Sequence, residues 1–238
     1  MNKRSSRGSP TRRPKAAGKA APKASPKAPG KAQHRFPFGQ AVLPPGVVPE
    51  GTRRRILEAA LQLFASQGFH GVSVRDLAQE LGLQPSALYA HFPSKEHVLA
   101  ELTLVGHQAQ HEALRAAILD AGAEPVAQLQ ALVRHNARLH ATYPQLAIVA
   151  NEELHALPLE LAAATLELRK QSAALLLEVI LRGAALGRFC CPSPQVTAAA
   201  IGAMGLRIPY WYKPGGELAI DALASIHAEL ALRMLGVC

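Results

Sequence analysis

The sequence predicts an all-α protein with an N-terminal helix-turn-helix domain, a C-terminal helical domain and a disordered basic tail in front of both. Three observations support this fold class. Apolar residues recur at helical spacing on both sides of a Gly-centred turn within residues 72–95. Helical periodicity and a high content of Ala and Leu then continue from Val105 to Cys238, without a strand-like alternating segment. The net charge of +9 of this 238-residue chain is concentrated in its first 50 residues.

Residues 72–95 contain the start and stop signals of two short helices. One apolar stripe marks the first helix, at positions i, i+3, i+4 and i+7: Val74, Leu77, Ala78 and Leu81. Ser73 can cap this helix, and Asp76 stands three residues later, as in a capping box. Gly82 lies where the chain must turn sharply, and Pro85 suits the first position of the second helix.

The second helix is expected to have a polar outer face. Leu88 and Phe92, four residues apart, would anchor the helix to the core. The remaining side chains then face outward: Ser86, Ala87, Tyr89, Ala90 and His91. An outward Tyr and His on a short helix are better explained by nucleic-acid contacts than by packing. Because a helix-turn-helix places its second helix in the DNA major groove, the motif predicts DNA binding.

Two further helices are expected on either side of this motif. Upstream, a helix from about residue 52 to residue 67 has one apolar stripe: Ile56, Ala59, Ala60, Leu63 and Phe64. Gly68 is well placed to end it. Downstream, Ser94 can cap a helix in which Val98, Leu99 and Leu102 are apolar.

This arrangement resembles the tetracycline-repressor-like (TetR) family of transcriptional regulators over about residues 51–102. The resemblance rests on these residues: Arg55-Ile56-Leu57-Glu58-Ala59-Ala60, Phe64, Gly68, Phe69, Val74-Arg75-Asp76-Leu77-Ala78, Leu81-Gly82-Leu83, Leu88-Tyr89-Ala90-His91-Phe92 and Ser94-Lys95-Glu96. Gln84 departs from the family pattern, which has Ser or Thr as the cap of the second helix. This departure leaves open which operator bases are read.

The resemblance implies a homodimeric, ligand-responsive regulator, expected to be a repressor, that binds a palindromic DNA operator. Its two recognition helices would read half-sites about 34–36 Å apart, or a multiple of that spacing. The candidate phosphate contacts are Ser73, Arg75, Tyr89 and Lys95. The candidate base contacts are Ser86, Ala87 and His91. Ligand binding is expected to favour a state whose recognition helices are too far apart for DNA.

The basic charge lies in a low-complexity N-terminal segment. Residues 1–50 hold 11 of the 26 Lys and Arg residues but only one of the 17 acidic residues, Glu50. The rest of the chain therefore has 15 basic and 16 acidic residues, a net charge of −1. Residues 14–32 offer no apolar side chain larger than Ala or Pro to bury, so the tail is expected to be disordered. Two interpretations stay open: a basic arm that adds phosphate affinity, or a segment without a role in DNA binding, which is either a solubilising extension or translated from a wrongly assigned start codon.

These observations divide the chain into three parts: a tail over residues 1–49, a DNA-binding domain over 50–103, and a ligand-binding and dimerisation domain over 104–238. In the third part, Pro and Gly breaks predict helices over residues 104–121, 125–142, 145–156, 158–187, 195–212 and 217–235. No apolar run approaches the ~18 residues of a membrane span, and the N-terminus lacks the apolar core of a secretory signal. Three cysteines do not make a disulfide framework. We expect reduced thiols and a cytoplasmic protein without a membrane partner.

The sequence offers no support for an enzyme. It has no Gly-rich phosphate loop, no GxGxxG after a strand and no GxSxG elbow. The segment His111-Glu112-Ala113-Leu114-Arg115 begins like the zinc motif HExxH but ends in Arg. His107 and His111, four residues apart, are interpreted as part of a partly exposed helical face and not as a metal site. We expect no catalytic residue, no metal and no cofactor.

Three polar residues stand on apolar stripes of the C-terminal helices. Asn136 and His140 share one face with Leu129, Leu132, Val133, Leu139 and Tyr143. Arg169 is the one charge in a seam of Ala162, Leu166, Ala173, Leu176 and Ile180. A buried Arg needs an anionic partner or several acceptors. One interpretation is structural: an ion pair of Arg169 with Glu152, Glu153 or Glu167, and a hydrogen bond between Asn136 and His140. The other is a ligand pocket with apolar walls and a few convergent polar groups.

The C-terminal half also resembles a subgroup of TetR-like regulators that respond to acyl-coenzyme A thioesters in lipid and steroid catabolism. The residues concerned are His140-Ala141-Thr142-Tyr143-Pro144-Gln145-Leu146, Asn151-Glu152-Glu153-Leu154, Leu168-Arg169-Lys170 and Trp211-Tyr212-Lys213-Pro214-Gly215-Gly216. This resemblance implies an apolar channel for the acyl group, with Arg or Lys near its mouth for the phosphates. The candidate ligand-binding residues are Asn136, His140, Asn151, Arg169 and Lys170.

Two other functions are weighed against a regulator. A non-specific architectural DNA-binding protein driven by the Lys/Ala/Pro tail would show a steep salt dependence and little preference for a palindrome. An all-helical enzyme using His140 and Asn136 would need a nucleophile, and the sequence places none beside them.

Overall fold

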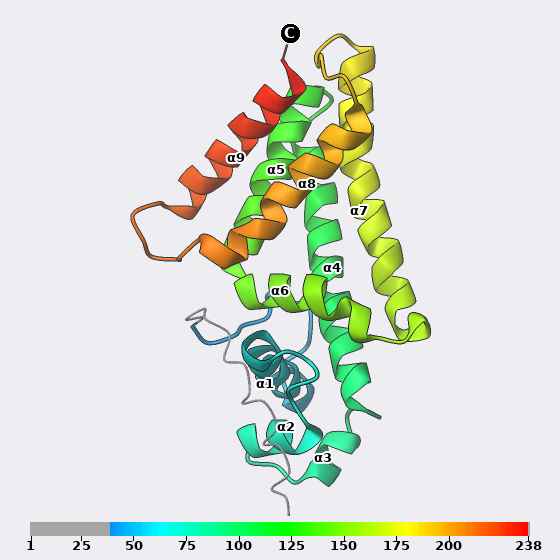
Figure 1. The fold of residues 1–238 in the computed structure, drawn as a ribbon, viewed down its shortest axis with the longest axis vertical. Helices are drawn as coiled ribbons and strands as arrows, with labels where there is room; N and C mark the ends of the chain where they lie inside the picture. The colour runs from blue at the N-terminus through cyan, green and yellow to red at the C-terminus, as the bar shows by residue number, and fades with distance from the viewer. Residues whose placement is uncertain (1–38, 238) are drawn as a thin grey trace, which may run out of the picture. The chain divides into compact units, whose positions relative to one another are not determined.

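The computed structural model describes residues 39–237, and these residues form a helical fold (Figure 1). The elements follow one another in this order: α1 (Thr52–Gln67), α2 (Val74–Glu80), α3 (Pro85–Tyr89), α4 (Lys95–Asp120), α5 (Pro125–Thr142), α6 (Pro144–Glu152), the 3-10 helix η1 (Glu153–Ala156), α7 (Leu159–Ala185), α8 (Pro194–Trp211) and α9 (Ile220–Leu235). The β-type pairing found within the described range is an isolated antiparallel bridge between Phe189 and Val237. The predicted all-α class is confirmed.

Helix α1 supplies the centre of the first apolar core. Its buried side chains include Ile56, Leu57, Ala60, Leu61 and Phe64. The buried face is therefore not quite the predicted stripe, whose Ala59 and Leu63 are only half-buried. The reason is that α2, α4 and α6 all contact α1, so the buried residues of α1 lie on more than one face of the helix. Gly68 ends α1 as predicted, with a φ of 72° that favours glycine.

Helix α4 is continuous over 26 residues and belongs to two apolar cores. Val98 and Leu99 pack in the core around α1, whereas Leu114 packs in a second core with residues of α5, α7, α8 and α9. The predicted domain boundary between residues 103 and 104 thus falls inside one helix. No proline interrupts the sequence between Ser94 and Gly122, so nothing ends the helix there.

Helix α5 lies at the centre of the C-terminal region, where it contacts α4, α6, α7, α8 and α9. Prolines mark several helix starts, as predicted: α5 begins at Pro125, α6 at Pro144 and α8 at Pro194. The predicted helix over residues 145–156 is divided, because its last four residues adopt the 3-10 geometry of η1. The last helix begins at Ile220, later than the predicted residue 217.

Residues 39–49 form an N-terminal arm that packs on the first core. Ala41, Leu43 and Val48 are buried beside the apolar residues of α1. The backbone N–H of Ala41 donates to Gln62 Oε1 of α1 (2.8 Å), and Gln145 Nε2 of α6 donates to the carbonyl of Gly39 (2.8 Å). The structure therefore differs from the predicted tail over this stretch, since these residues have apolar side chains to bury. The rest of the predicted tail, residues 1–38, lies outside the described residues.

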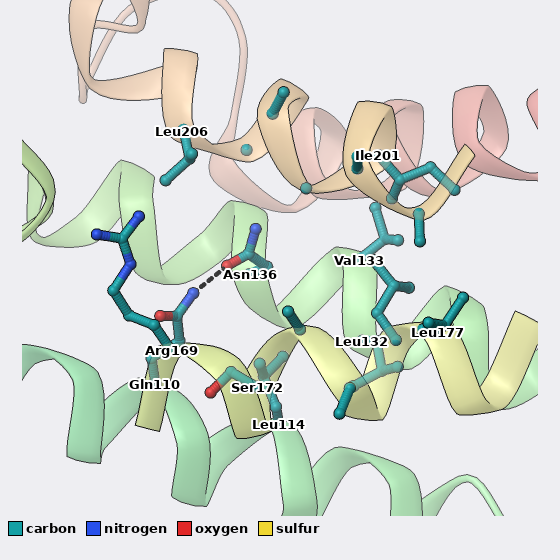
Figure 2. Close-up of a pocket in the computed structure, with 18 of the residues that line it drawn as sticks. Gln110, Leu114, Leu132, Val133, Asn136, Arg169, Ser172, Leu177, Ile201 and Leu206 are labelled. Atoms are coloured by element: carbon teal, nitrogen blue, oxygen red, sulfur yellow. Dashed lines mark hydrogen bonds between the residues drawn. The ribbon is translucent and has the colours of Figure 1, made fainter. Parts of the chain in front are cut away.

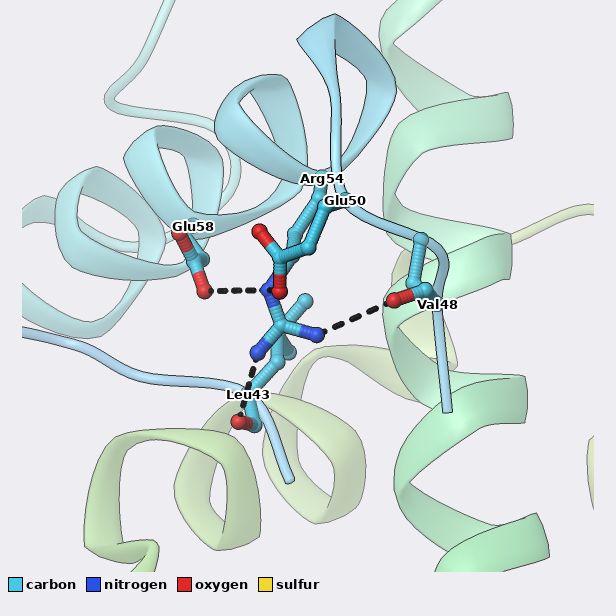
Figure 3. A network of polar contacts seen from close by, with 5 residues as sticks. All are labelled: Leu43, Val48, Glu50, Arg54 and Glu58. Atoms are coloured by element: carbon cyan, nitrogen blue, oxygen red, sulfur yellow. Dashed lines mark hydrogen bonds and ion pairs between the residues drawn. The ribbon is translucent and has the colours of Figure 1, made fainter. Parts of the chain in front are cut away.

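Arg54 holds this arm against α1 (Figure 3). Its side chain is buried, and its guanidinium donates to the carbonyl oxygens of Leu43 (2.9 Å) and Val48 (3.1 Å). Its Nε lies 3.0 Å from Glu58 Oε1 and 3.4 Å from Glu50 Oε1. One charged group thus satisfies two backbone acceptors of the arm and is itself paired with carboxylates, as a buried charge requires.

The predicted reduced state of the thiols is wrong for Cys190, which is disulfide-bonded, whereas Cys191 is a free thiol. The chain around Cys190 lies beside the end of α9, where the Cys190 N–H donates to the carbonyl of Leu235 (2.8 Å). This neighbourhood arises from tertiary packing, which cysteine spacing in the sequence does not reveal.

Replacing Arg54 tests the role of the arm. Arg54→Ala should lower the free energy of unfolding by about 3 kcal/mol, because it removes hydrogen bonds from a charged donor to buried acceptors. Urea titration followed by circular dichroism measures this change. Arg55→Ala, an exposed neighbour on the same helix, should change it by less than about 0.5 kcal/mol. Equal effects of the two substitutions would contradict the assignment.

Candidate DNA-binding surface and ligand cavity

Local caps shape the helix-turn-helix. The capping box predicted for α2 is confirmed: Ser73 Oγ accepts from the Asp76 N–H (3.2 Å), and Asp76 Oδ2 accepts from the Ser73 N–H (2.8 Å). Gly82 has a φ of 65° in the turn, which favours glycine. Pro85 starts α3, and the side chain of Gln84 before it makes no cap hydrogen bond.

Helix α3 presents the predicted residues away from the core. Leu88 and Phe92 are buried and anchor the helix as expected. On the outer side, the Tyr89 side chain is 55% exposed, Ser86 is exposed, and Ala87 and His91 are half-buried. Arg75 on the neighbouring α2 is exposed as well. The outer face of α3 is thus free to contact a partner.

Lys95, a predicted phosphate contact, is already engaged within the protein. Its Nζ donates to the carbonyls of Phe69 (2.8 Å) and Val72 (2.7 Å) and lies 4.0 Å from the centroid of the Phe69 ring. Partial burial lowers the pKa of this ammonium below its usual value. Lys95 therefore fixes the segment between α1 and α2 to the start of α4. No pattern in the sequence indicates this contact, because the carbonyls lie more than 20 residues away along the chain.

Arg53 clamps the end of α3 to two other helices. Its Nη1 donates to the carbonyl of His91 (2.7 Å), directly after the recognition helix. Its Nε and Nη2 form a bidentate pair with Glu101 of α4, with an Nε–Oε1 distance of 2.9 Å. The guanidinium also lies 4.2 Å from the centroid of the Phe92 ring. Sequence reasoning missed this residue, since its carboxylate partner is 48 positions away.

A cavity of about 590 Å³ opens between α4, α5, α7 and α8 (Figure 2). Its volume lies in the range typical of small-molecule sites. Its apolar walls include Leu114, Leu132, Val133, Leu176, Leu177, Ile201 and Leu206. All five predicted ligand-binding residues line it: Asn136, His140, Asn151, Arg169 and Lys170. The structure thus brings together side chains that the sequence places on three separate helices.

The amides of this cavity bond differently from the predicted Asn136–His140 pair. Asn136 Oδ1 accepts from Gln110 Nε2 of α4 (2.8 Å), as Figure 2 shows. Asn151 Nδ2 donates to the backbone carbonyl of Ala147 (2.7 Å). Gln110 is a lining residue that sequence reasoning missed.

Arg169 is exposed at the edge of the cavity, so its predicted burial is wrong. Within residues 39–237 it forms no ion pair, and Glu167 lies 4.0 Å from Lys170 Nζ instead. The reason is the face with which α7 packs. Thr165 and Ser172 of α7 face α4, where Thr165 Oγ1 lies 3.3 Å from Thr103 Oγ1. The middle of the seam, with Arg169, Ala173 and Leu176, is left beside the cavity.

Two buried histidines stand at the inner side of the cavity. His107 and His140 are each only 3% exposed, and burial lowers the pKa of each imidazole to about 4. Both rings are therefore neutral at physiological pH. The burial of His107 corrects the predicted exposed face. A signal was present in the sequence, since His107 and the apolar Leu114 are seven residues apart on α4.

The described residues show neither a metal cluster nor a membrane span. Between residues 39 and 237, no three His, Cys, Asp or Glu side chains gather in a way that could hold a metal ion. None of the helices in that range is long and apolar enough to cross a bilayer.

Comparisons with known proteins agree with this architecture. Residues 56–102 match the family model "Bacterial regulatory proteins, tetR family", and residues 122–235 match "Tetracyclin repressor-like, C-terminal domain". The chain belongs to the TetR family. The family model describes bacterial regulatory proteins, and the relatives reported below are transcriptional regulators.

Several TetR proteins are similar to this chain over most of their length. The HTH-type transcriptional repressor KstR2 of Rhodococcus jostii is 28% identical over 184 residues, which cover 76% of this chain and 90% of that protein. The crystal structure of PfmR from Thermus thermophilus superposes with a TM-score of 0.69 at 30% identity, covering 76% of this chain and 98% of PfmR. AibR, crystallised with isovaleryl coenzyme A and operator DNA, superposes with a TM-score of 0.69 at 26% identity, covering 78% of this chain and 99% of AibR.

The neutral histidines predict a loss of stability in acid. The pKa of about 4 in the folded protein lies below the ordinary value of 6.5, so the unfolded chain binds more protons between these values. The free energy of unfolding should therefore fall as pH falls from 6.5 towards 4, by about 2 kcal/mol per histidine at pH 5.

Urea titrations at pH 7 and pH 5 measure this effect in the wild type and in His107→Gln. The variant should lose about 2 kcal/mol less than the wild type between the two pH values. His70→Gln, which removes an exposed histidine, should retain the wild-type pH dependence. The same pH dependence in His107→Gln and the wild type would contradict a neutral, buried His107.

Proposed function

We propose that this chain is a homodimeric repressor that releases a palindromic operator when an acyl-CoA thioester binds its cavity. The observation that carries the proposal is the composition of the cavity. Its walls are apolar, its inner polar groups are neutral, and its cations, Arg169 and Lys170, stand at the exposed edge. An acyl chain suits the walls, and the phosphates of coenzyme A suit the edge.

The DNA-binding half of the proposal rests on the outer face of α3. Ser86, Ala87 and His91 would face base edges, while Tyr89, together with Arg75 of α2, would contact phosphates. We do not include Ser73, because its N–H and its hydroxyl both donate to Asp76 Oδ2. We do not include Lys95 among the phosphate contacts, because its ammonium already holds two backbone carbonyls. The palindrome would follow from the two-fold symmetry of the dimer.

The dimer is supported by exposed apolar side chains on the last two helices. Ile226, Leu230 and Met234 are spaced by four residues along α9 and are 38–45% exposed. On α8, Leu206 and Trp211 are exposed as well. Exposed apolar side chains repeated along helix faces are typical of protein–protein contacts. A second copy of the chain covering α8 and α9 would bury it and fix the distance between the two α3 helices.

The effector half is supported by the edge of the cavity and by known relatives. Arg169 lines the cavity together with Asn136 and Leu206, as Figure 2 shows. A guanidinium binds phosphate oxygens in a bidentate fashion, and the neighbouring Lys170 adds a point charge. AibR has been crystallised with isovaleryl coenzyme A and operator DNA, and KstR2 is a transcriptional repressor.

Substitutions in α3 test the proposed DNA contacts. The operator for this test is first selected from random DNA with the purified protein. Tyr89→Ala should weaken binding to operator and random DNA alike, since it removes a phosphate contact. Ala87→Gln or His91→Ala should instead change the preference among operator variants. Fluorescence anisotropy at moderate salt measures both effects. A Tyr89→Ala protein with wild-type operator affinity would rule out this placement of α3.

A further prediction concerns the effector. A long-chain or polycyclic acyl-CoA should bind in calorimetry and weaken operator affinity by ~5–150-fold. Arg169→Ala should impair acyl-CoA binding while leaving operator affinity without ligand unchanged.

Arg115→Ala is the matched control, because Arg115 is an exposed arginine of α4 outside the cavity. It removes the same charge and should leave the acyl-CoA response intact. A ligand panel in which only compounds without coenzyme A bind and release DNA would contradict the proposed effector class.

A further inference from the structure

The inner side of the cavity holds three polar side chains with unused hydrogen-bonding groups. They are His107 of α4 and Asn136 and His140 of α5, named here the polar subsite. His107 and His140 are each 3% exposed, and the Nδ1 atom of each lacks a well-formed hydrogen bond, with the Gln110 side chain close to the His107 ring and the Gly205 backbone close to the His140 ring. Buried polar atoms without partners are rare in native proteins and call for an explanation, such as a ligand or an ordered water.

The existing contacts determine what the subsite can offer. His107 Nε2 lies 3.3 Å from the carbonyl of Ala150, which can only accept, so Nε2 carries the proton and Nδ1 is an acceptor. Asn136 Oδ1 is occupied by Gln110 Nε2, so the Asn136 amide offers its N–H groups. The subsite therefore presents a donor and an acceptor, both uncharged.

A glycine of α8 makes room for this arrangement. A Cβ atom at Gly205 would lie 2.2 Å from Asn136 Nδ2 and 3.3 Å from His140 Nδ1. Both side chains thus converge on the backbone of one residue of α8, and Figure 2 shows Asn136 between α5 and the α8 ribbon. Gly202, one turn earlier on α8, also lines the cavity, but a Cβ there would meet nothing within 4 Å.

We propose that the polar subsite recognises an uncharged oxygen function, a ketone or hydroxyl, on the acyl part of the effector. This inference rests on the proposed function, since it takes the cavity to be the effector site. A ketone accepts from the Asn136 amide, and a hydroxyl can in addition donate to His107 Nδ1. A carboxylate is disfavoured, because the cations of the cavity, Arg169 and Lys170, stand at its exposed edge and leave an inner anion unpaired.

Three coenzyme A thioesters of equal chain length test the inference by calorimetry: decanoyl-CoA, 9-oxodecanoyl-CoA and the mono-CoA thioester of decanedioic acid. The wild type should bind the oxo compound about tenfold more tightly than decanoyl-CoA, since it satisfies a polar group that decanoyl-CoA leaves unpaired. The carboxylate compound should bind most weakly.

Two glycine substitutions on α8 form a matched pair. Gly205→Ala places a methyl group against the movable end of Asn136, so the tenfold preference should fall to about onefold while decanoyl-CoA affinity stays within about threefold. Gly202→Ala adds the same methyl group in open space and should retain the preference. Thermal unfolding checks that both variants fold. If Gly205→Ala does not fold, Asn136→Leu takes its place with the same expected loss.

The outcomes separate this inference from the proposed effector class. Equal wild-type affinities for the oxo and unsubstituted thioesters would overturn the polar subsite. If no thioester binds, the acyl-CoA proposal fails, and 2-decanone is then compared with decanoate. Tighter binding of 2-decanone, reduced in Gly205→Ala but not in Gly202→Ala, would still support the subsite. No preference between these two compounds would overturn it.

Discussion

The helix α4 connects the helix-turn-helix to the cavity. Its first turn is tied to the segment between α1 and α2, because Lys95 donates to two carbonyls there. One turn and a half later, Glu101 pairs with Arg53, which holds the carbonyl of His91 at the end of the recognition helix. Further along the same helix, His107 and Gln110 line the cavity. Since no proline interrupts α4, we expect a displacement at the cavity to move its anchored end as well.

The cavity itself follows from the packing of α7. This helix contacts α4 through Thr165 and Ser172 and also packs against α5 and α8, while Leu176 and Leu177 on the same helix line the cavity. On the opposite side, α8 lines the cavity with small residues, among them Gly202 and Gly205, whose lack of a side chain leaves space in the cavity. The space between α7 and α8 is therefore open in the single chain. The polar side chains on its inner side come from α4 and α5.

Local signals in the sequence were sufficient for the elements and for part of the site. The capping box of Ser73 and Asp76, the prolines at helix starts and the outward face of α3 depend on neighbours within a few residues. The ligand candidates Asn136 and His140 were found because a polar residue on an apolar stripe is visible in the sequence alone. The structure places both in one cavity with Arg169, Lys170 and Asn151.

Contacts between distant segments could not be predicted in the same way. The periodicity of apolar residues only separates buried from exposed helix faces. It therefore could not show that the seam with Arg169 borders a cavity. The packing of residues 39–49 depends on Arg54 and on Gln145 of α6, which no local rule relates to the arm. The clamp of Arg53 and the anchoring of Lys95 likewise join groups that come together only in the folded chain.

Removing the contacts of Arg53 with Glu101 and with the carbonyl of His91 tests most directly whether α4 couples the cavity to the recognition helix. The measurement is the factor by which saturating decanoyl-CoA weakens operator affinity, in the wild type and in Arg53→Gln. Because the logarithm of that factor gives the coupling free energy between two sites, the factor should fall towards one in Arg53→Gln while decanoyl-CoA affinity without DNA stays unchanged. An unaltered factor in Arg53→Gln would contradict the account that α4 and its clamp connect the cavity to the recognition helix.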